Sequence, residues 1–431
     1  MKVIIVGCGL GGLSCAISCL KEGLQVTILE RAPEILPVGA GIQIPPNATR
    51  VLNYYGLEEQ LEKSGAIRIE DRLLRRYSDG RILCIRPGGK KMVEDFGFPY
   101  YVIHRADYQN LLIEEVLRQG ADLRMGAEVV DVTFGASPTV TLRNGQILDA
   151  DVIVGADGLW SHLREQVLGH PNPPEETGDL AYRGTFSRTQ LENFQDPIVD
   201  AIINDNKQHL WMGPGKHCSF YPVRGGTEFN LVLLRPDNLP AGARTAAGDV
   251  LEMRSTFDDW DPALQKIISC MDSVLKWKLC HMHELDTWVK GHVALLGDAC
   301  HPSLPYQAQG AAMAVEDGCV LGILLGRANR ESSNAAELRR NLPSILDLYE
   351  SLRKSRTTVN VKGSIRNRTM FHMPDGEEQR ARDEALAKVT WKEPCVWQWG
   401  DIGYLKKLNG FDVIKDTNRV FDQWVGHVAK I

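Results

Sequence analysis

The residues whose types and spacing could do chemistry begin at a glycine-rich turn, GCGLGG at residues 7–12. In this spacing Gly7 permits a tight turn, Gly9 lets backbone approach a pyrophosphate, and Gly12 lets the following helix pack closely on its strand. The N–H groups at the start of that helix form an anion site. Glu30 lies about 20 residues on, where an acidic side chain hydrogen-bonds ribose hydroxyls. The pattern predicts the ADP half of FAD, or NAD, and a glycine turn without a ligand is the alternative.

Two further motifs place an aspartate after a buried strand. The strand VIV at residues 152–154 leads to Asp157, which in isolation is an ordinary Asp-Gly turn. Asp298 ends another short apolar strand, and Gly310 and Ala311 begin a helix rich in small residues. An aspartate there can reach a sugar-like hydroxyl, and a glycine at a helix start lets bare N–H groups face an electron-rich carbonyl. A loop with a capping aspartate is the alternative.

A buried parallel sheet must position these motifs. Residues 3–6 and 25–29 form strands that flank a helix, which is the start of a βαβ unit. Apolar β-branched runs return at 152–154 and 293–296, as in strands buried on both faces. Residues 180–288 between them alternate like the strands of a second domain. The order predicts an α/β protein whose discontinuous nucleotide-binding domain carries an inserted domain.

Three turn-rich stretches complete the expected elements. Residues 72–86 and 126–150 have the pattern of short antiparallel strands joined by turns. Residues 36–46 (LPVGAGIQIPP) are rich in glycine and proline and predict a loop.

Composition excludes several functional classes. The 49 basic and 55 acidic residues give a net charge of −6, which argues against a nucleic-acid binder because phosphate affinity depends on clustered Lys and Arg. No apolar stretch approaches the roughly 18 residues of a membrane-spanning helix. Ten scattered cysteines show no spacing typical of a metal site, so we expect reduced thiols and no bound metal. We therefore expect a cytoplasmic protein, as a monomer or homodimer.

The three motifs together, in this order and separation, resemble the group A flavoprotein monooxygenases, the family with the para-hydroxybenzoate hydroxylase-like fold. The resemblance covers nearly the whole chain. Residues 372–379 (HMPDGEEQ), with Arg382 and Asp383, are most similar to fungal salicylate hydroxylase-like FAD-dependent monooxygenases. The resemblance implies a Rossmann-like FAD-binding domain in two pieces, an inserted mixed-sheet substrate domain and a helical C-terminal region. The corresponding boundaries are 1–175 (with substrate-domain strands near 72–98), 176–288, 289–345 and 346–431.

The resemblance also implies which residues hold FAD. Asp298 matches a contact to the ribityl or pyrophosphate region, and Asp157 matches a loop that binds both FAD and a transient nicotinamide. Arg105 matches a contact to the linking chain of the flavin, and a surface salt bridge with Asp107 is its alternative. The full set of implied cofactor-binding residues is Gly7, Gly9, Gly12, Glu30, Gly41, Arg105, Asp157, Asp298, Gly310 and Ala311.

Candidate catalytic residues lie in the inserted domain. Arg183 stands where related enzymes carry an arginine near the substrate, and it could pair with a carboxylate, carbonyl or phenolate. His217 and Tyr221 could polarise or deprotonate a phenol, and on a strand they share a face because four residues separate them. The alternatives are a satisfied core histidine and a packing tyrosine. His301 follows Asp298, and we expect it to support that loop.

The resemblance implies FAD-dependent hydroxylation of a phenolic aromatic substrate that consumes NAD(P)H and O2. In this family reduced flavin forms a C4a-hydroperoxide whose distal oxygen attacks the ring. The substrate would be a salicylate-type compound or a polyketide-derived phenol of secondary metabolism. An epoxidase or dearomatising hydroxylase of the same fold is one alternative. A flavin-binding protein or reductase without oxygenase turnover is another.

Overall fold

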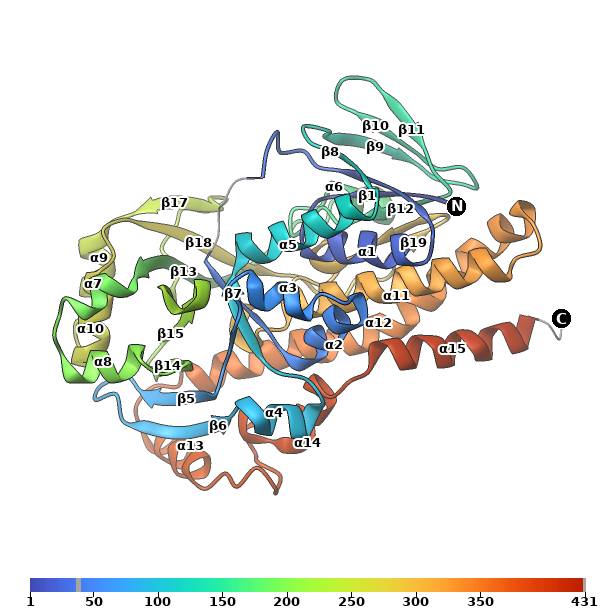
Figure 1. Cartoon of the computed structure of the whole chain (residues 1–431). Coiled ribbons are helices and arrows are strands. Elements are labelled where there is room, and N and C mark those ends of the chain that lie inside the picture. Colours follow the sequence, from blue (N-terminus) through green and yellow to red (C-terminus); the bar gives the residue numbers. More distant parts are fainter. Residues whose placement is uncertain (36–39, 429–431) are drawn as a thin grey trace.

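The computed structural model describes residues 1–35 and 40–428, and its first layer is a six-stranded sheet (Figure 1). The strand order is β19-β20-β12-β1-β2-β8, and all neighbours run parallel except β19 and β20. The strands are β1 (Lys2–Val6), β2 (Gln25–Leu29), β8 (Asp122–Arg124), β12 (Val152–Gly155), β19 (Val289–Lys290) and β20 (Val293–Leu295). Two distant parts of the chain therefore share one sheet, as the buried apolar runs predicted.

Helix α1 (Leu10–Lys21) packs against β1 and β2 of this sheet and is crossed by helix α11 (Gly310–Glu331) in close contact. A Cβ added at Gly318 would lie 2.4 Å from a backbone nitrogen of α1. The hydroxyl of Ser18 donates to the carbonyl of Cys319 over 3.0 Å. Small residues thus let two helix backbones touch, and this crossing holds the starts of both helices near the same sheet edge.

Two small sheets flank the first layer. Strands β9 (Val129–Thr133), β10 (Thr139–Leu142) and β11 (Ile147–Asp149) form an antiparallel meander, as the pattern at 126–150 predicted. The other sheet contains β3 (Gly41–Ile44), β7 (Tyr101–His104) and β4 (Ile67–Arg68).

The predicted loop at 36–46 is therefore wrong in part. Residues 36–39 lie outside the described residues, but 41–44 pair antiparallel with β7 and Pro46 begins helix α2 (Pro46–Tyr55). The alternating Ile42 and Ile44 allow a strand there despite the flanking glycine and prolines, and Pro46 is compatible with the first turn of a helix.

The second layer is an eight-stranded mixed sheet in the order β17-β18-β13-β16-β15-β14-β5-β6. Figure 1 shows β5 and β6, coloured blue, beside the green β14. The strands are β5 (Asp71–Arg76), β6 (Ile82–Pro87), β13 (Glu175–Ser187), β14 (Lys207–Gly213), β15 (Lys216–Val223), β16 (Glu228–Pro236), β17 (Thr245–Gly248) and β18 (Val274–His281). An early hairpin thus joins strands from a region more than 100 residues later, by parallel pairing of β5 (Asp71) with β14 (Lys207).

The remaining helices pack around these sheets. Those before residue 300 are α3 (Glu58–Lys63), α4 (Gly89–Phe96), α5 (Arg105–Arg118), α6 (His162–Leu168), α7 (Arg188–Glu192), α8 (Pro197–Ile203), α9 (Val250–Ser255) and α10 (Pro262–Ser269). The C-terminal helices are α12 (Ala335–Phe371), α13 (Glu377–Ala387), α14 (Ile402–Asn409) and α15 (Val413–Val428). Short 3₁₀ turns are η1 (Arg224–Gly226), η2 (Gly297–Ala299), η3 (Pro305–Gln307) and η4 (Gln398–Gly400).

The helical C-terminal region agrees with the sequence pattern. The domain boundaries proposed from the sequence stay a prediction, and the one at 345/346 falls inside the 37-residue helix α12. Among residues 1–35 and 40–428, no helix combines the length and apolar character needed to cross a bilayer.

A buried ion network joins α11 and α12. Arg353 of α12 donates through Nε to Asp317 Oδ1 and through Nη2 to Glu316 Oε2, each over 2.7 Å. Arg356 adds two bonds to Glu316, of 2.8 and 2.7 Å. The side chains of Glu316 and Asp317 are fully buried. Burial by itself would raise the pKa of both carboxyl groups, but the arginines, with His301 on Asp317, hold each pKa below its usual value.

We expect Arg353→Met to destabilise the protein by about 3–5 kcal/mol, because Asp317 would lose its only arginine partner in the described residues and Glu316 one of its two. Urea unfolding of the holoenzyme measures the change. The matched control is Arg339→Met, which removes a half-exposed arginine whose nearest carboxylate, on Asp151, is 3.6 Å away. The control should cost less than about 1 kcal/mol, and equal effects of the two changes would contradict a supporting role for the network.

Candidate active site

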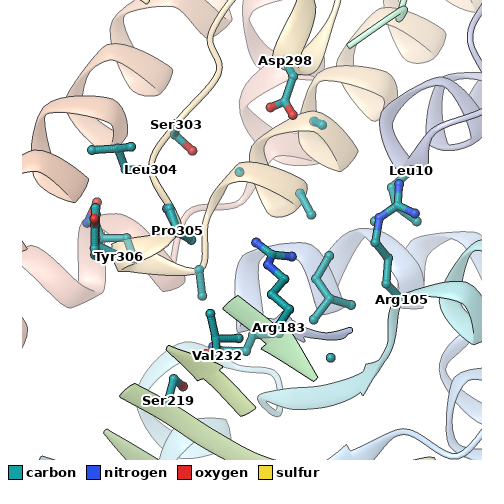
Figure 2. Close-up of a pocket in the computed structure, with 18 of the residues that line it drawn as sticks. Leu10, Arg105, Arg183, Ser219, Val232, Asp298, Ser303, Leu304, Pro305 and Tyr306 are labelled. Atoms are coloured by element: carbon teal, nitrogen blue, oxygen red, sulfur yellow. The ribbon is translucent and has the colours of Figure 1, made fainter. Parts of the chain in front are cut away.

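A cavity of about 390 Å³ lies between the two main sheets, at the edge where α1 and α11 begin (Figure 2). Most of the residues singled out in the sequence line it, although they come from separate parts of the chain. Those residues are Gly9, Gly12, Gly41, Arg105, Arg183, His217, Tyr221, Asp298, Gly310 and Ala311. Gly7, Glu30 and Asp157 lie behind this lining.

The glycine turn at residues 7–12 has the geometry that each glycine was expected to provide. Gly7 has φ +112°, and a Cβ there would lie 2.3 Å from the carbonyl oxygen of Ala156. A Cβ at Gly12 would lie 2.2 Å from the Gly7 oxygen, whereas one at Gly9 would meet nothing within 4 Å. Gly9 is also the N-cap of α1 and supplies no side-chain cap. The cavity therefore borders bare N–H groups at a helix start, which suit an anionic group.

Glu30 secures this turn from behind. Its Oε2 accepts from the backbone N–H of Cys8 and its Oε1 from that of Ala32, both over 2.9 Å. An ionised carboxylate has about four acceptor positions, so two hydrogen bonds leave capacity for ribose hydroxyls. Glu30 as a cofactor contact stays a prediction.

Asp157 organises its own loop. The carboxylate accepts from the Ser161 hydroxyl over 2.5 Å and from the backbone N–H groups of His162 and Leu163 over 2.8 and 3.1 Å. These bonds secure the start of α6 and turn the carboxylate from the cavity, while the neighbouring Gly158 lines it. The local geometry therefore gives Asp157 a supporting role, and its contact with a cofactor stays a prediction.

Arg105 does not form the expected alternative salt bridge. Asp107 instead binds Arg224, with 3.1 Å between Oδ2 and Nε. Arg105 lines the cavity, and the one hydrogen bond of its side chain among the described residues is a long one, 3.4 Å from Nη1 to Gln109 Oε1. Burial lowers its pKa, and the field of Asp298 opposes that shift. The surface-salt-bridge interpretation of Arg105 is therefore wrong.

Asp298 lies opposite Arg105 (Figure 2). Its side chain is exposed and lines the cavity, whereas its neighbours Gly297 and Ala299 are buried. Burial raises its pKa, against the fields of His301 and Arg105. Gly297, just before it, has φ +63° and donates its N–H to Asp317 over 3.2 Å. His301 Nε2 also contacts Asp317, at 2.5 Å, which agrees with the expectation that His301 supports the loop.

The start of α11 forms a second bare helix end. Gln309 is the N-cap and makes no capping bond, and Gly310 and Ala311 follow at the cavity wall. Ala308, with φ +57°, turns the chain into the helix. The N–H groups of this turn can face a polar ring edge, as the sequence suggested.

The eight-stranded sheet supplies the opposite wall. On β15 the alternating residues His217, Ser219 and Tyr221 all line the cavity, so the predicted shared face of His217 and Tyr221 is observed. A Cβ at Gly41 would lie 2.5 Å from Tyr221 Cε2, so only a glycine fits against that ring. Burial raises the pKa of Tyr221 and Arg183 opposes the shift.

Arg183 extends from β13 into the space between Pro305 and Arg105 (Figure 2). Its Nε is buried and has no hydrogen-bond partner among the described residues. Burial lowers its pKa, Tyr221 opposes the shift and Arg105 adds to it. A half-buried arginine whose Nε is unpaired calls for an acceptor, and the cavity is where one would bind.

His217 is joined to a residue that the sequence did not single out as catalytic. Its Nδ1 lies 2.8 Å from Nε2 of His372, just after α12. His372 also lines a surface recess of about 330 Å³. Burial and His372 lower the pKa of His217 well below its usual value, and burial lowers the pKa of His372 to about 4. Both rings are therefore neutral at pH 7, and the pair links the cavity to the surface.

Sequence reasoning also missed part of the cavity wall. Arg72, Gln208, Phe371 and Trp399 line the cavity beyond His217. They come from strands β5 and β14 and from the C-terminal region, and no motif in the sequence connects them.

Comparisons with known proteins agree with this geometry. Residues 1–364 match the family model described as "FAD binding domain". The chain is 40% identical over 422 residues to "FAD-dependent monooxygenase OpS4" of Beauveria bassiana (strain ARSEF 2860), which covers 96% of each chain. It is 36% identical over 334 residues to "3-hydroxybenzoate 6-hydroxylase 1" of Aquipseudomonas alcaligenes, across 76% of this chain and 81% of that one.

A solved salicylate hydroxylase substrate complex has the same fold, with a TM-score of 0.79 and 22% identity over 97% of both chains. These findings confirm the predicted resemblance and the fold class. With two bare helix starts, an open glycine and an Asp298 and Arg105 pair at one end of the cavity, the residues present fit FAD. The chain belongs to the FAD binding domain family and is an FAD-dependent monooxygenase of the aromatic hydroxylase type.

Proposed function

We propose that this protein hydroxylates a phenolic ring, with NAD(P)H as the electron donor and O2 as the oxygen source. The observation that carries the proposal is the wall formed by Arg183, His217 and Tyr221, which faces the cavity that the two helix starts border. The 3-hydroxybenzoate 6-hydroxylase relative supports a phenolic substrate, because 3-hydroxybenzoate is a phenol.

The cavity wall that the starts of α1 and α11 form would hold FAD. The N–H groups at the start of α1 would bind the pyrophosphate, with Glu30 on the ribose. Asp298 and Arg105 would bind the chain that links the pyrophosphate to the flavin, and the N–H groups of Gly310 and Ala311 would face the pyrimidine edge. The flavin, once reduced, supplies the activated oxygen for hydroxylation.

His217 would accept the phenolic proton. A phenolate is a much better carbon nucleophile than a phenol, so removal of this proton prepares the ring for an electrophilic oxygen. The low pKa of His217 keeps the ring neutral and able to accept a proton. His372, with Asp179 and Arg368 close by, would carry the proton toward the surface recess. Arg183 would stabilise the negative charge of the phenolate.

Apolar side chains would keep water from the reacting ring. The substrate end of the cavity is walled by Leu210, Val232, Leu234, Phe371 and Trp399. A dry site protects activated oxygen from unproductive loss as hydrogen peroxide. The sequence has a single GxGxxG turn, which favours a nicotinamide that docks, reduces the flavin and leaves.

We expect phenols to accelerate NAD(P)H oxidation and to acquire one labelled oxygen atom from ¹⁸O2. Mass spectrometry of products from a panel of hydroxybenzoates and alkylphenols measures this, and hydrogen peroxide assays measure uncoupled turnover. A product without label from every phenol would remove the hydroxylase proposal and favour a reductase. A labelled epoxide or dearomatised ring would assign the alternative oxygenation.

Asp298→Ala should weaken FAD binding roughly tenfold to a hundredfold, since a hydrogen bond to a charged group contributes about 1.5–3 kcal/mol. Flavin fluorescence released on dilution measures the dissociation constant. Asp131→Ala, which removes an exposed carboxylate on β9, is the matched control. Full retention of FAD by the Asp298 variant at nanomolar protein would exclude the proposed contact.

His217→Phe should reduce kcat/KM at pH 7 by roughly 10²–10⁴-fold, the usual contribution of a positioned base. The variant should recover as pH rises toward about 10, where a phenol ionises unaided. The wild type should keep its activity below pH 6.5, because the pKa of His217 is lowered, and lose it only as the pH falls through that pKa. Identical pH profiles of the two proteins would show that His217 is only a packing residue.

A further inference from the structure

Two buried arginines stand side by side at the substrate end of the cavity. Arg72 on β5 is in register with Gln208 on β14 and with Arg86 on β6. Arg72 and Gln208 line the cavity, and Arg86 stands in the next strand behind them. Only 8% of the surface of Arg72 and 4% of that of Arg86 is exposed.

Neither arginine has a carboxylate partner among residues 1–35 and 40–428. Arg72 donates through Nε to Gln208 Oε1 over 3.0 Å, and no described residue hydrogen-bonds its Nη atoms. The Nε and Nη2 atoms of Arg86 are buried without any hydrogen-bond partner. Aromatic rings hold both guanidinium groups in place, with Arg72 4.5 Å from the Tyr100 ring centroid and Arg86 5.5 Å from that of Trp399.

This arrangement is unfavourable unless an anion completes it. A buried charge without a partner is strongly unfavourable, and two adjacent like charges add to the cost. Burial and the nearby Arg72 push the pKa of Arg86 well below its usual value. Among the described residues, Asp298 is the one acid in the cavity wall; it stands by Arg105 with the proposed cofactor-binding residues, so it does not neutralise this pair.

We infer that Arg72, backed by Arg86, forms an anion subsite that binds the carboxylate of an aromatic acid substrate. The planar guanidinium of Arg72 matches a carboxylate in a two-point geometry. Gln208 orients the guanidinium through Nε and leaves both Nη groups for the ligand. The inference rests on the proposed function, because it names the substrate class of that same cavity.

The sheet separates this subsite from Arg183. In the order β13-β16-β15-β14-β5, Arg183 and Arg72 are four strands apart, which corresponds to roughly 19 Å between backbones. Strand β15, with His217 and Tyr221, lies midway, roughly 10 Å from β5. Gln208, which is paired with Arg72, donates to Ser219 of β15 over 3.1 Å. A ring whose carboxylate binds Arg72 thus points its opposite side toward β15, and Arg183 is left for the oxygen of the phenolate.

The test compares an acid with its neutral counterpart in the FAD-loaded enzyme. The probes are 3-hydroxybenzoate and 3-hydroxybenzamide, with 2,4-dihydroxybenzoate and its amide as a second pair, and the dissociation constants come from perturbation of the flavin spectrum. The wild type should bind each acid at least tenfold more tightly than its amide. Arg72→Met should abolish this preference, and Arg72→Lys should restore part of it.

Controls separate the subsite from other charges. Arg68→Met removes a largely exposed arginine near the same sheet and should keep the preference. Arg183→Met should weaken the acid and the amide alike. Equal binding of acid and amide by the wild type, absence of binding by both acids, or a preference lost in Arg183→Met but kept in Arg72→Met would each overturn the subsite.

The outcomes for the subsite and for the proposed function are distinguishable. Tight, Arg72-dependent binding of an acid that never acquires labelled oxygen would support the subsite and contradict hydroxylation. Labelled products from neutral phenols, with no preference for the acids, would support hydroxylation and overturn the subsite. A normal flavin content in each Arg72 variant establishes that the protein is folded.

Discussion

The buried contact of Arg353 with Glu316 and Asp317 is the interaction on which the site depends. Asp317 also accepts from Gly297 and contacts His301, so the loop that carries Asp298 is bound to the same carboxylate. Glu316 accepts from Asn47 of α2 over 2.8 Å. One pair of acids therefore fixes the end of β20, the helix α11 and the helix α12 relative to each other, and the cofactor wall forms where they meet.

The close crossing of α1 and α11 has a second consequence for the site. Because Gly318 lets the helices touch, their N-termini open on the same cavity. Two regions with unsatisfied N–H groups thus face one space, and the opposite sheet provides arginines rather than acids. Of the acids in the described part of the chain, Asp298 alone lines the cavity, at the end proposed for the cofactor. This difference between the ends follows from the positions of strands and helix starts.

Much of this could be predicted from the sequence because it is encoded locally. A glycine at a forced turn, as at Gly7, or at an open approach, as at Gly9, leaves a signature within a few residues. The paired strands of the first sheet were recognisable from their apolar runs. Alternation on one strand was enough to place His217 and Tyr221 on a common face.

What the sequence could not reveal is long-range placement. Arg72 and Arg86 share the predicted hairpin at 72–86, but Arg72 reaches the cavity wall because β5 pairs with β14, and both arginines meet Trp399 because the chain returns from its C-terminal end. No local pattern encodes those two long-range placements. The His372 contact with His217 likewise joins residues 155 positions apart. Asp157 shows a different limit. Its motif is recognisable in the sequence, but the sequence does not reveal that its carboxylate binds the N–H groups of its own loop.

The long helix α12 crosses from one half of the molecule to the other and ends at the cavity. The match to the family model stops at residue 364, within that helix, whereas Phe371, His372 and Trp399 follow it. Part of the far wall of the pocket thus lies beyond the matched residues, although its strands lie within them. Substrate selectivity can therefore change through substitutions in the last seventy or so residues, while the residues that surround the cofactor site stay the same.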